Sequence, residues 1–276
     1  MSPGRDVTAA RSDASTGRGG LRLPALVLAA DHRARGIVTV ERYVDYVRIV
    51  SACLAHSDGL IASVQPLGDL AASGALSPAH QVYLSANRTG LYGTSFQIDD
   101  RLVVSLERAA GLGVAGVKLM TRIDHADPRT AEALSLLARV LEEAAALGLD
   151  VMVEALAWSE GRFLRDTDAV VLAAVIAHDM GSPLLKVPVP DAPAGEARRE
   201  AVARVVASVG APVLFLGGPG GDDDGDDPLE ARRYVLEEVA DVMAGGGAGM
   251  AMGRRLYLDP DPGEATRLVA DAVHRR

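Results

Sequence analysis

Apolar and polar positions follow two different periods along this chain. From residue 21 onward, short apolar runs typical of strands alternate with longer stretches in which apolar residues recur at helical spacing. The short runs predict strands at residues 25–30, 59–64, 82–86, 116–122, 150–156, 184–189, 212–216 and 249–252. The longer stretches predict helices at residues 40–56, 101–112, 128–147, 167–179, 195–209, 229–244 and 262–275. The stretch 67–76, between the second and third strands, is the weakest of the expected helices.

This alternation predicts a parallel sheet built from right-handed βαβ units. Eight strands in about 250 residues match a (β/α)8 TIM barrel, an α/β fold that here forms a single domain over residues 21–276. An open, doubly wound sheet is the alternative. The barrel is favoured because polar residues follow the carboxyl ends of so many different strands. Residues 1–20 are rich in Ser, Gly and Arg and are expected to form a disordered tail.

Net charge and cysteine content limit which binding partners and which cellular compartment we expect for this protein. The net charge of −9 argues against nucleic acid or an anionic membrane surface as the main partner. Much of this charge lies in the run 222–227, which we interpret as a solvated loop rather than a calcium site. Cys53 is the single cysteine, falls on a helical apolar pattern and excludes an internal disulfide. No apolar run reaches membrane-spanning length, so we expect a cytoplasmic protein that acts on a small molecule.

The lysines carry the main chemical signal. The chain has 28 Lys and Arg residues, but only Lys118 and Lys186 are lysines, and both lie inside apolar strand-like runs. Burial disfavours the ammonium form, and a neutral lysine amine is a nucleophile that forms imines, which arginine cannot do. A buried stem with its ammonium group reaching solvent is the alternative for one isolated lysine. Two such lysines favour Schiff-base chemistry at Lys186, with the charge of Lys118 lowering the pKa of Lys186 across the barrel.

Two carboxylates are the candidates for proton transfer. Asp31 directly follows the first strand, and Glu154 lies within the fifth. Imine chemistry needs a base and an acid, roles that positioned carboxylates can serve. A structural ion pair is the alternative role for both. His32 is either a further acid/base group or a residue that orients Asp31 by a hydrogen bond.

Residues for binding a phosphorylated substrate follow the last two strands. Gly217 and Gly218 come after the seventh strand, and Gly253 and Arg254 come after the eighth. Loops at these positions of a barrel frequently bind phosphate, and arginine matches phosphate with two parallel hydrogen bonds. Glycine is also the ordinary turn residue, so the glycines alone are a weak signal. Arg122, in the fourth strand, and His32 complete the candidate substrate-binding set. The six histidines are scattered without a metal-binding spacing, so we expect neither a metal nor a cofactor.

These strand-end residues resemble the class I aldolase superfamily of deoxyribose-phosphate, archaeal-type fructose-bisphosphate and tagatose-bisphosphate aldolases. The chain is most similar to a bacterial (β/α)8 family associated with inositol-catabolism genes, in the motifs Asp31-His32-x-Ala34-Arg35-Gly36, Asn87-Arg88-x-Gly90-Leu91, Asp99-Asp100-Arg101 and Arg122-Ile123-Asp124. The resemblance implies a Schiff base on Lys186, supporting roles for Lys118 and Glu154, an acid/base role for Asp31, and a phosphate site at Gly217, Gly218, Gly253 and Arg254. The chain departs from the superfamily in lacking a tyrosine at the end of the fourth strand and in having Ala155 after Glu154.

The sequence therefore predicts a class I aldolase, a carbon–carbon lyase of carbohydrate metabolism acting on a phosphorylated ketose or a deoxy-keto-sugar acid. The resemblance to a family associated with inositol-catabolism genes implies a place on the inositol route. One alternative is a transaldolase-like or biosynthetic aldol condensation enzyme. The other is a regulator that binds a sugar phosphate on an aldolase scaffold without turnover. Barrels of this kind often assemble, so the prediction is compatible with a homo-oligomer.

Overall fold

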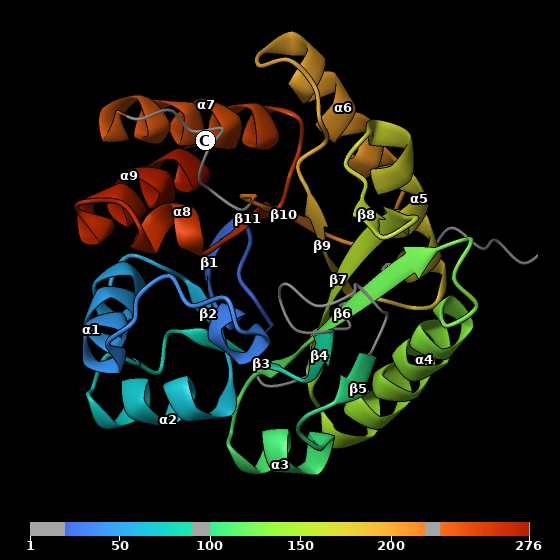
Figure 1. The fold of residues 1–276 in the computed structure, drawn as a ribbon, viewed down its shortest axis with the longest axis horizontal. Helices are drawn as coiled ribbons and strands as arrows, with labels where there is room; N and C mark the ends of the chain where they lie inside the picture. The colour runs from blue at the N-terminus through green and yellow to red at the C-terminus, as the bar shows by residue number, and fades with distance from the viewer. Residues whose placement is uncertain (1–19, 90–99, 219–226, 276) are drawn as a thin grey trace, which may run out of the picture.

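Eight parallel strands close into a barrel in the computed structural model, which describes residues 20–89, 100–218 and 227–275 (Figure 1). Each barrel strand pairs with the next along the chain, and the last pairs with the first, so no edge is left open. The barrel strands are β1 (Ala25–Ala30), β2 (Gly59–Ala62), β3 (Gln81–Ser85), β6 (Gly116–Asp124), β7 (Asp150–Ser159), β9 (Leu184–Pro188), β10 (Val213–Leu216) and β11 (Gly249–Met252). This confirms the TIM barrel and excludes the open sheet.

Helices surround the barrel as an outer layer, one after each strand (Figure 1). They are α1 (Tyr43–Leu54), α2 (Val64–Ala72), α3 (Leu106–Gly111), α4 (Thr130–Leu147), α5 (Thr167–Asp179), α6 (Glu196–Ala207), α7 (Pro228–Ala244) and α9 (Pro262–His274). Two short helical segments, η1 (His32–Arg35) after β1 and α8 (Arg254–Tyr257) after β11, lie at the carboxyl ends of these strands. None of the helices in the described part of the chain has the length and apolar character needed to cross a membrane.

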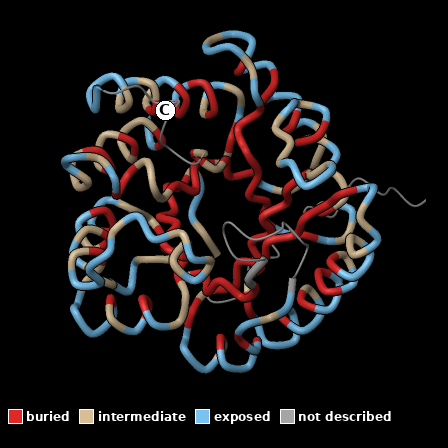
Figure 2. The backbone as a smooth tube through the Cα atoms, viewed as in Figure 1, coloured by how far each residue is buried: buried red, intermediate tan, exposed pale blue. Residues whose placement is uncertain are grey.

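The barrel strands are mostly buried (Figure 2). Their side chains alternate between two core layers, one facing the helices and one inside the barrel. Outward-facing strand residues such as Leu26 and Leu28 pack against the helices. The barrel interior is filled by Ala25, Val27, Ala29, Ile61, Tyr83, Met152, Leu184, Leu214 and Ala251. The small residues of β1 and β11 lie in the same inner layer as the larger Tyr83 and Met152, so a core poor in aromatic residues still fills the barrel.

Some element boundaries differ from the sequence prediction. The strand expected at 59–64 ends at Ala62, because Ser63 is the N-cap of α2. The helix expected at 101–112 begins only at Leu106, since residues Asp100–Leu102 form β5, antiparallel to β4 (Asn87–Thr89). β6 and β7 continue beyond their predicted ends, because they pair with each other from Gly116–Asp150 to Asp124–Trp158, and β8 (Arg162–Phe163) folds back on β7. The predicted tail residues 1–19 and the acidic residues 222–226 lie outside the described residues.

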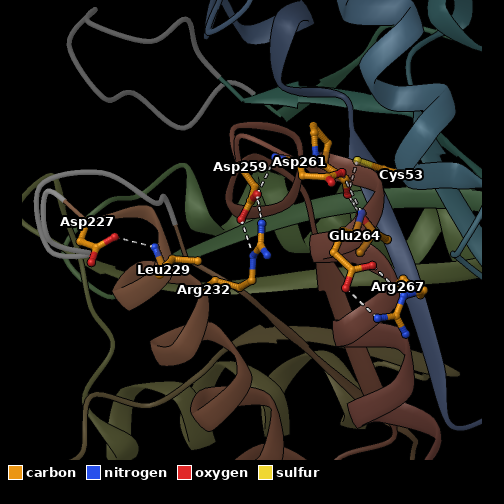
Figure 3. A network of polar contacts seen from close by, with 10 residues as sticks. Cys53, Asp227, Leu229, Arg232, Asp259, Asp261, Glu264 and Arg267 are labelled. Atoms are coloured by element: carbon orange, nitrogen blue, oxygen red, sulfur yellow. Dashed lines mark hydrogen bonds and ion pairs between the residues drawn. The ribbon is translucent and has the colours of Figure 1, made fainter.

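A polar network fastens the last helices of the outer layer to each other (Figure 3). Arg232 of α7 binds both carboxylate oxygens of Asp259, at 3.0 and 2.5 Å, in the loop between α8 and α9. Asp259 Oδ1 also accepts the backbone N–H of Asp261, and Asp261 Oδ1 accepts the backbone N–H of Glu264 at the start of α9. The network thus ties α7 to the loop that connects β11 to α9.

Candidate active site

The candidate residues form a second inward-facing layer directly above the inner core. Because side chains alternate along a strand, the residue two positions after an inner-core residue also points into the barrel. Ala29 is followed in this way by Asp31, Met152 by Glu154 and Leu184 by Lys186. Strand register brings the residues of neighbouring strands level, with Ser85 beside Lys118 and Glu154 beside Lys186. The strand period therefore explains why residues far apart in sequence meet here.

A chain of close polar contacts joins the two lysines and the two carboxylates. Lys186 Nζ lies 2.9 Å from Glu154 Oε1, and Lys118 Nζ lies 3.0 Å from Glu154 Oε2. Lys118 Nζ also lies 2.8 Å from Asp31 Oδ2, which accepts a hydrogen bond of 2.8 Å from Ser85 Oγ. All four charged residues are at least 93% buried. Glu154 thus separates the two lysines, an arrangement that the sequence did not indicate, and the two positive charges are balanced by two negative ones.

Burial and ion pairing shift the pKa values of these buried groups in opposite directions. Burial raises the pKa of the Asp31 carboxyl, but nearby positive groups, above all Lys118, outweigh it and hold that pKa below its usual range. For Glu154 burial again raises the pKa, and Lys118 and Lys186 overcome it and lower the pKa to about 2. Burial lowers the pKa of Lys118, but Asp31 and Glu154 carry it above its usual range. Both carboxylates are therefore ionised and Lys118 is protonated at neutral pH.

His32 lies beside this cluster in an environment that keeps its ring neutral. Burial lowers the pKa of His32 to about 4, and the positive charges of Arg254 and Lys186 act in the same direction against Asp31. Its Nδ1 lies 3.4 Å from the hydroxyl of Tyr257, and the two rings meet edge to face. His32 is therefore an uncharged polar group at neutral pH, positioned by Tyr257 of α8.

Close packing and backbone conformation favour the glycines after β10 and β11, most strongly at Gly253. A Cβ atom on Gly217 would lie 2.6 Å from Met252 Cε, and one on Gly253 would lie 2.2 Å from the carbonyl oxygen of Ala29. Gly218 has a φ of 68°, in the left-handed region that favours glycine. Arg254 follows Gly253 as the first residue of α8. The structure thus brings all four predicted phosphate-binding residues to the carboxyl ends of neighbouring strands.

Relatives of this chain share the same architecture. The sequence model of the Cgl0159-like family matches residues 23–273. The chain belongs to the Cgl0159-like family. The solved structure of Cgl0159 from Corynebacterium glutamicum is 30% identical and superimposes with a TM-score of 0.75, over 91% of this chain and 86% of that one. An archaeal fructose 1,6-bisphosphate aldolase has a TM-score of 0.74 over 90% of this chain and 93% of that one, and at 21% identity this likeness concerns the fold.

Curated relatives of this Cgl0159-like chain include two synthases. A 2-amino-3,7-dideoxy-D-threo-hept-6-ulosonate synthase from Archaeoglobus fulgidus is 26% identical over 90% of this chain and 85% of its own length. A 2-amino-4,5-dihydroxy-6-oxo-7-(phosphonooxy)heptanoate synthase from Streptomyces griseus is 34% identical over 40% of this chain. That second match spans about a third of the curated relative, 35% of its length.

The Cgl0159-like chain also carries arginines near the glycines that sequence reasoning missed. The position of a Gly218 Cβ would be 3.7 Å from Arg165 Nη1 and 3.7 Å from Arg255 Nη2. Arg165 pairs with Asp191 at 2.6 Å, and Arg255 pairs with the buried Glu238 at 3.0 Å. Both guanidinium groups are therefore held in place beside Gly218. The spacing of apolar residues gave no signal for Arg165, which lies just after β8. At the end of the eighth strand, the sequence prediction selected Arg254 and not its neighbour Arg255.

Asn87 appears in the sequence only as part of a motif, and the structure gives it a role that the motif did not specify. Its side-chain amide donates to the carbonyl oxygen of Met120 at 2.7 Å and accepts from the Met120 N–H at 2.9 Å. The buried amide thus makes the two hydrogen bonds to the Met120 backbone that a neighbouring strand would otherwise make. Met120 lies on β6, two residues beyond Lys118. Such a contact depends on tertiary register, so no sequence period could have predicted it.

Arg122 stacks on Trp158 near the carboxyl end of β6. It is 98% buried, and its guanidinium carbon lies 4.6 Å from the ring centre of Trp158, on the part of β7 that extends beyond the barrel. This stacking is a cation–π contact that fixes the Arg122 side chain at the rim. In the described part of the chain, no group of three or more His, Cys, Asp or Glu side chains is arranged to hold a metal ion.

Proposed function

We propose that this protein is a class I aldolase that forms a Schiff base between Lys186 and a phosphorylated ketose or a deoxy-keto-sugar acid. The observation that carries the proposal is the buried Lys186–Glu154–Lys118–Asp31 chain of contacts. Four ionisable groups buried together at the carboxyl end of a barrel are costly for stability, and that cost is typical of a catalytic site. Membership of the Cgl0159-like family and similarity to Schiff-base aldolases support it.

Imine formation begins with a proton transfer that Glu154 is positioned to accept. Lys186 gives a proton to Glu154 Oε1, at 2.9 Å, and its neutral amine attacks the ketone carbon. The carbonyl oxygen takes up this proton and becomes the hydroxyl of a carbinolamine. It then receives the second proton released by the nitrogen and leaves as water, which gives the iminium. Starting from the ammonium, the step consumes and releases no net proton.

Cleavage of the carbon–carbon bond needs a base and an electron sink. Asp31, ionised in the resting site, accepts the proton of the substrate hydroxyl, and that oxygen becomes the aldehyde carbonyl as the bond breaks. The electron pair of the broken bond moves to the iminium and gives an enamine. Protonation of the enamine carbon and addition of water release the ketone and restore Lys186. Lys118, held protonated between Asp31 and Glu154, positions a substrate oxygen by its positive charge.

The phosphate of the ketose is assigned to the side of the barrel formed by β10 and β11. Gly217, Gly218, Gly253 and Arg254 lie there, and the restrained guanidinium groups near Gly218 add positive charge. His32 and Arg122 are the further candidates for contacts to substrate oxygens.

A role in inositol catabolism stays a prediction from sequence motifs. It is checked by measuring growth of a deletion strain on inositol as sole carbon source.

Borohydride trapping tests the proposal directly. The protein is incubated with dihydroxyacetone phosphate, pyruvate or acetaldehyde, reduced, and mapped by peptide mass spectrometry. We expect a reduced adduct on Lys186. Because Lys118 is the only other lysine in the chain, it serves as an internal control for nonspecific reaction. The Lys186→Arg variant keeps a positive charge beside Glu154 and is expected to lose the adduct.

Two outcomes would contradict this mechanism. An adduct on Lys118 alone would move the nucleophile to the other strand. No adduct with any of the three carbonyl compounds, together with thermal stabilisation by dihydroxyacetone phosphate, would favour the binding protein without turnover.

A biosynthetic aldol condensation is the second candidate function. The observation that favours it is the similarity to 2-amino-3,7-dideoxy-D-threo-hept-6-ulosonate synthase over 90% of the chain. Such an enzyme, or a transaldolase-like one, uses the same imine but passes the enamine to an acceptor aldehyde. Supplying a donor sugar phosphate with and without added aldehyde, and measuring products by mass spectrometry, distinguishes net cleavage from transfer.

A further inference from the structure

A cavity of about 320 Å³ opens beside the lysine–carboxylate cluster on the side of β1, β2, β3 and β6. Asp31, Ser85 and Lys118 line its inner end, while Arg35, Ser63 and other residues of η1 and the start of α2 line the remainder. In the closed strand order, β2 lies four strands from β9, which carries Lys186. The cavity therefore extends from the reacting groups away from the proposed phosphate side at β10 and β11.

Arg35 is the positive charge of this cavity that lacks a partner. Its Nε is buried without a hydrogen-bond acceptor, and no ion pair or hydrogen bond of its guanidinium is found among the described residues. The nearby Arg33 differs, because it donates to the Val40 carbonyl and stacks on Tyr43 and Tyr46. A guanidinium with a buried and unsatisfied N–H is costly, and an anionic ligand would remove this cost.

The polar groups near Arg35 also have unused hydrogen-bonding capacity. Ser63 is the N-cap residue of α2, but its side chain makes no capping hydrogen bond. Val64, Val103 and Met120 supply apolar walls to the same cavity. A small molecule with an apolar carbon segment and a polar terminus matches this lining, and the volume is in the range of small-ligand sites.

We propose that this cavity binds the aldehyde portion of the substrate, and that Arg35 binds an anionic terminus of that portion, a phosphate or a carboxylate. The inference rests on the proposed function and adds the substrate class to it. The ketone portion is held at Lys186, whereas Asp31 takes the proton from the oxygen that becomes the aldehyde. The aldehyde portion must therefore extend from Asp31, which lines the cavity. Arg35 lines the same cavity, and its positive charge selects aldehydes with a negative charge.

Calorimetric binding of unreactive probes tests this subsite without turnover. Glycerol 3-phosphate and glycerate carry the two possible anionic groups, and glycerol is the neutral control. We expect one or both anions to show a binding component that Arg35→Gln weakens at least tenfold and that Arg254→Gln retains. Arg35→Lys should keep part of it. The exposed Arg48 lies on α1 outside the cavity lining, so Arg48→Gln is the charge-matched control and should bind as the wild type does.

The outcomes separate this inference from the proposed function. Loss with glycerol 3-phosphate alone would identify a phosphate terminus, and loss with glycerate alone a carboxylate. If Arg35→Gln, folded by its thermal melt, binds both anions as tightly as the wild type, the subsite assignment is wrong. Borohydride trapping on the wild-type protein reports the imine independently, so a trapped adduct with unchanged anion binding would retain the aldolase and reject only the role of Arg35.

Discussion

At the scale of single residues, Glu154 has the most demanding position in the site. Each of its carboxylate oxygens contacts a different lysine, at 2.9 and 3.0 Å, inside the barrel. One carboxylate therefore both neutralises two buried ammonium groups and accepts the proton of the proposed nucleophile. A neutral residue of the same shape would leave only the Asp31 carboxylate, which contacts Lys118, to balance the two lysines.

The Glu154→Gln variant tests this double role. We expect the rate of Lys186 adduct formation to fall by about 10²–10⁴-fold, since a positioned acid–base group has been removed. The free energy of unfolding should fall by about 3–5 kcal/mol, since one partner of a buried ion pair is lost. Trapping kinetics and urea denaturation measure the two effects. A variant that traps donor at the wild-type rate would show that Glu154 has only a structural role.

At the scale of elements, the connection from β11 to α9 depends on ion pairs rather than on a long helix. α8 has only four residues, and the loop after it is held to α7 by Arg232 and Asp259 (Figure 3). The side chain of Asp259 is 7% exposed and that of Arg232 is 19% exposed, so water replaces this pair poorly. The segment that carries Arg254 thus owes its position partly to α7.

The Arg232→Ala variant is expected to lower the free energy of unfolding by about 1.5–3 kcal/mol, the contribution of hydrogen bonds to a charged group. Arg233→Ala is the matched control, because that neighbour is 73% exposed and lies 3.8 Å from Glu237. Its loss should cost about 0–1 kcal/mol. Chemical denaturation of both variants measures the difference, and equal effects would show that the network contributes no specific stability.

The spacing of apolar residues in the sequence predicted the barrel strands and most of the helices. The features that it did not predict depend on contacts between residues far apart in sequence or on very short strands. Asp31, Glu154 and Lys186 could be identified because each follows a buried strand residue at the spacing of two that turns it inward. The hairpin of β4 and β5 was missed because its three-residue strands are too short for a period. The contacts of Asn87 with β6 and of Arg165 with Asp191 depend on segments far apart in sequence meeting in space, and Arg35 was noted only as part of a motif.

At the scale of the whole molecule, the proposed chemistry divides the barrel into two sides. β10 and β11 carry the glycines assigned to the ketose phosphate, and the cavity on the side of β1, β2, β3 and β6 is assigned to the aldehyde. The buried charges between them also affect the stability of the whole fold. Groups whose pKa differs between the folded and unfolded states make that stability depend on pH.

His32 provides the pH dependence that is simplest to isolate. Its folded-state pKa of about 4 lies below the ordinary value of 6.5, so the unfolded chain binds more protons between these values. Its contribution to the free energy of unfolding is therefore fully present above pH 6.5 and is lost as the pH falls toward 4. We expect His32→Gln to flatten the decline in this window, measured by denaturant titrations at several pH values. An unchanged slope would mean that His32 is protonated equally in both states.

The layer of apolar side chains beneath the charged cluster has a consequence for how this architecture diversifies. Ala29 and Ala251 are small, whereas Tyr83 and Met152 in the same layer are large. Exchanging volume among these positions would tilt Asp31 or Glu154 relative to the lysines without changing any polar residue, because interiors transmit small shifts. Substrate range can therefore drift over evolution through uncharged, inaccessible positions, and engineering of new specificity has targets below the reacting groups as well as around them.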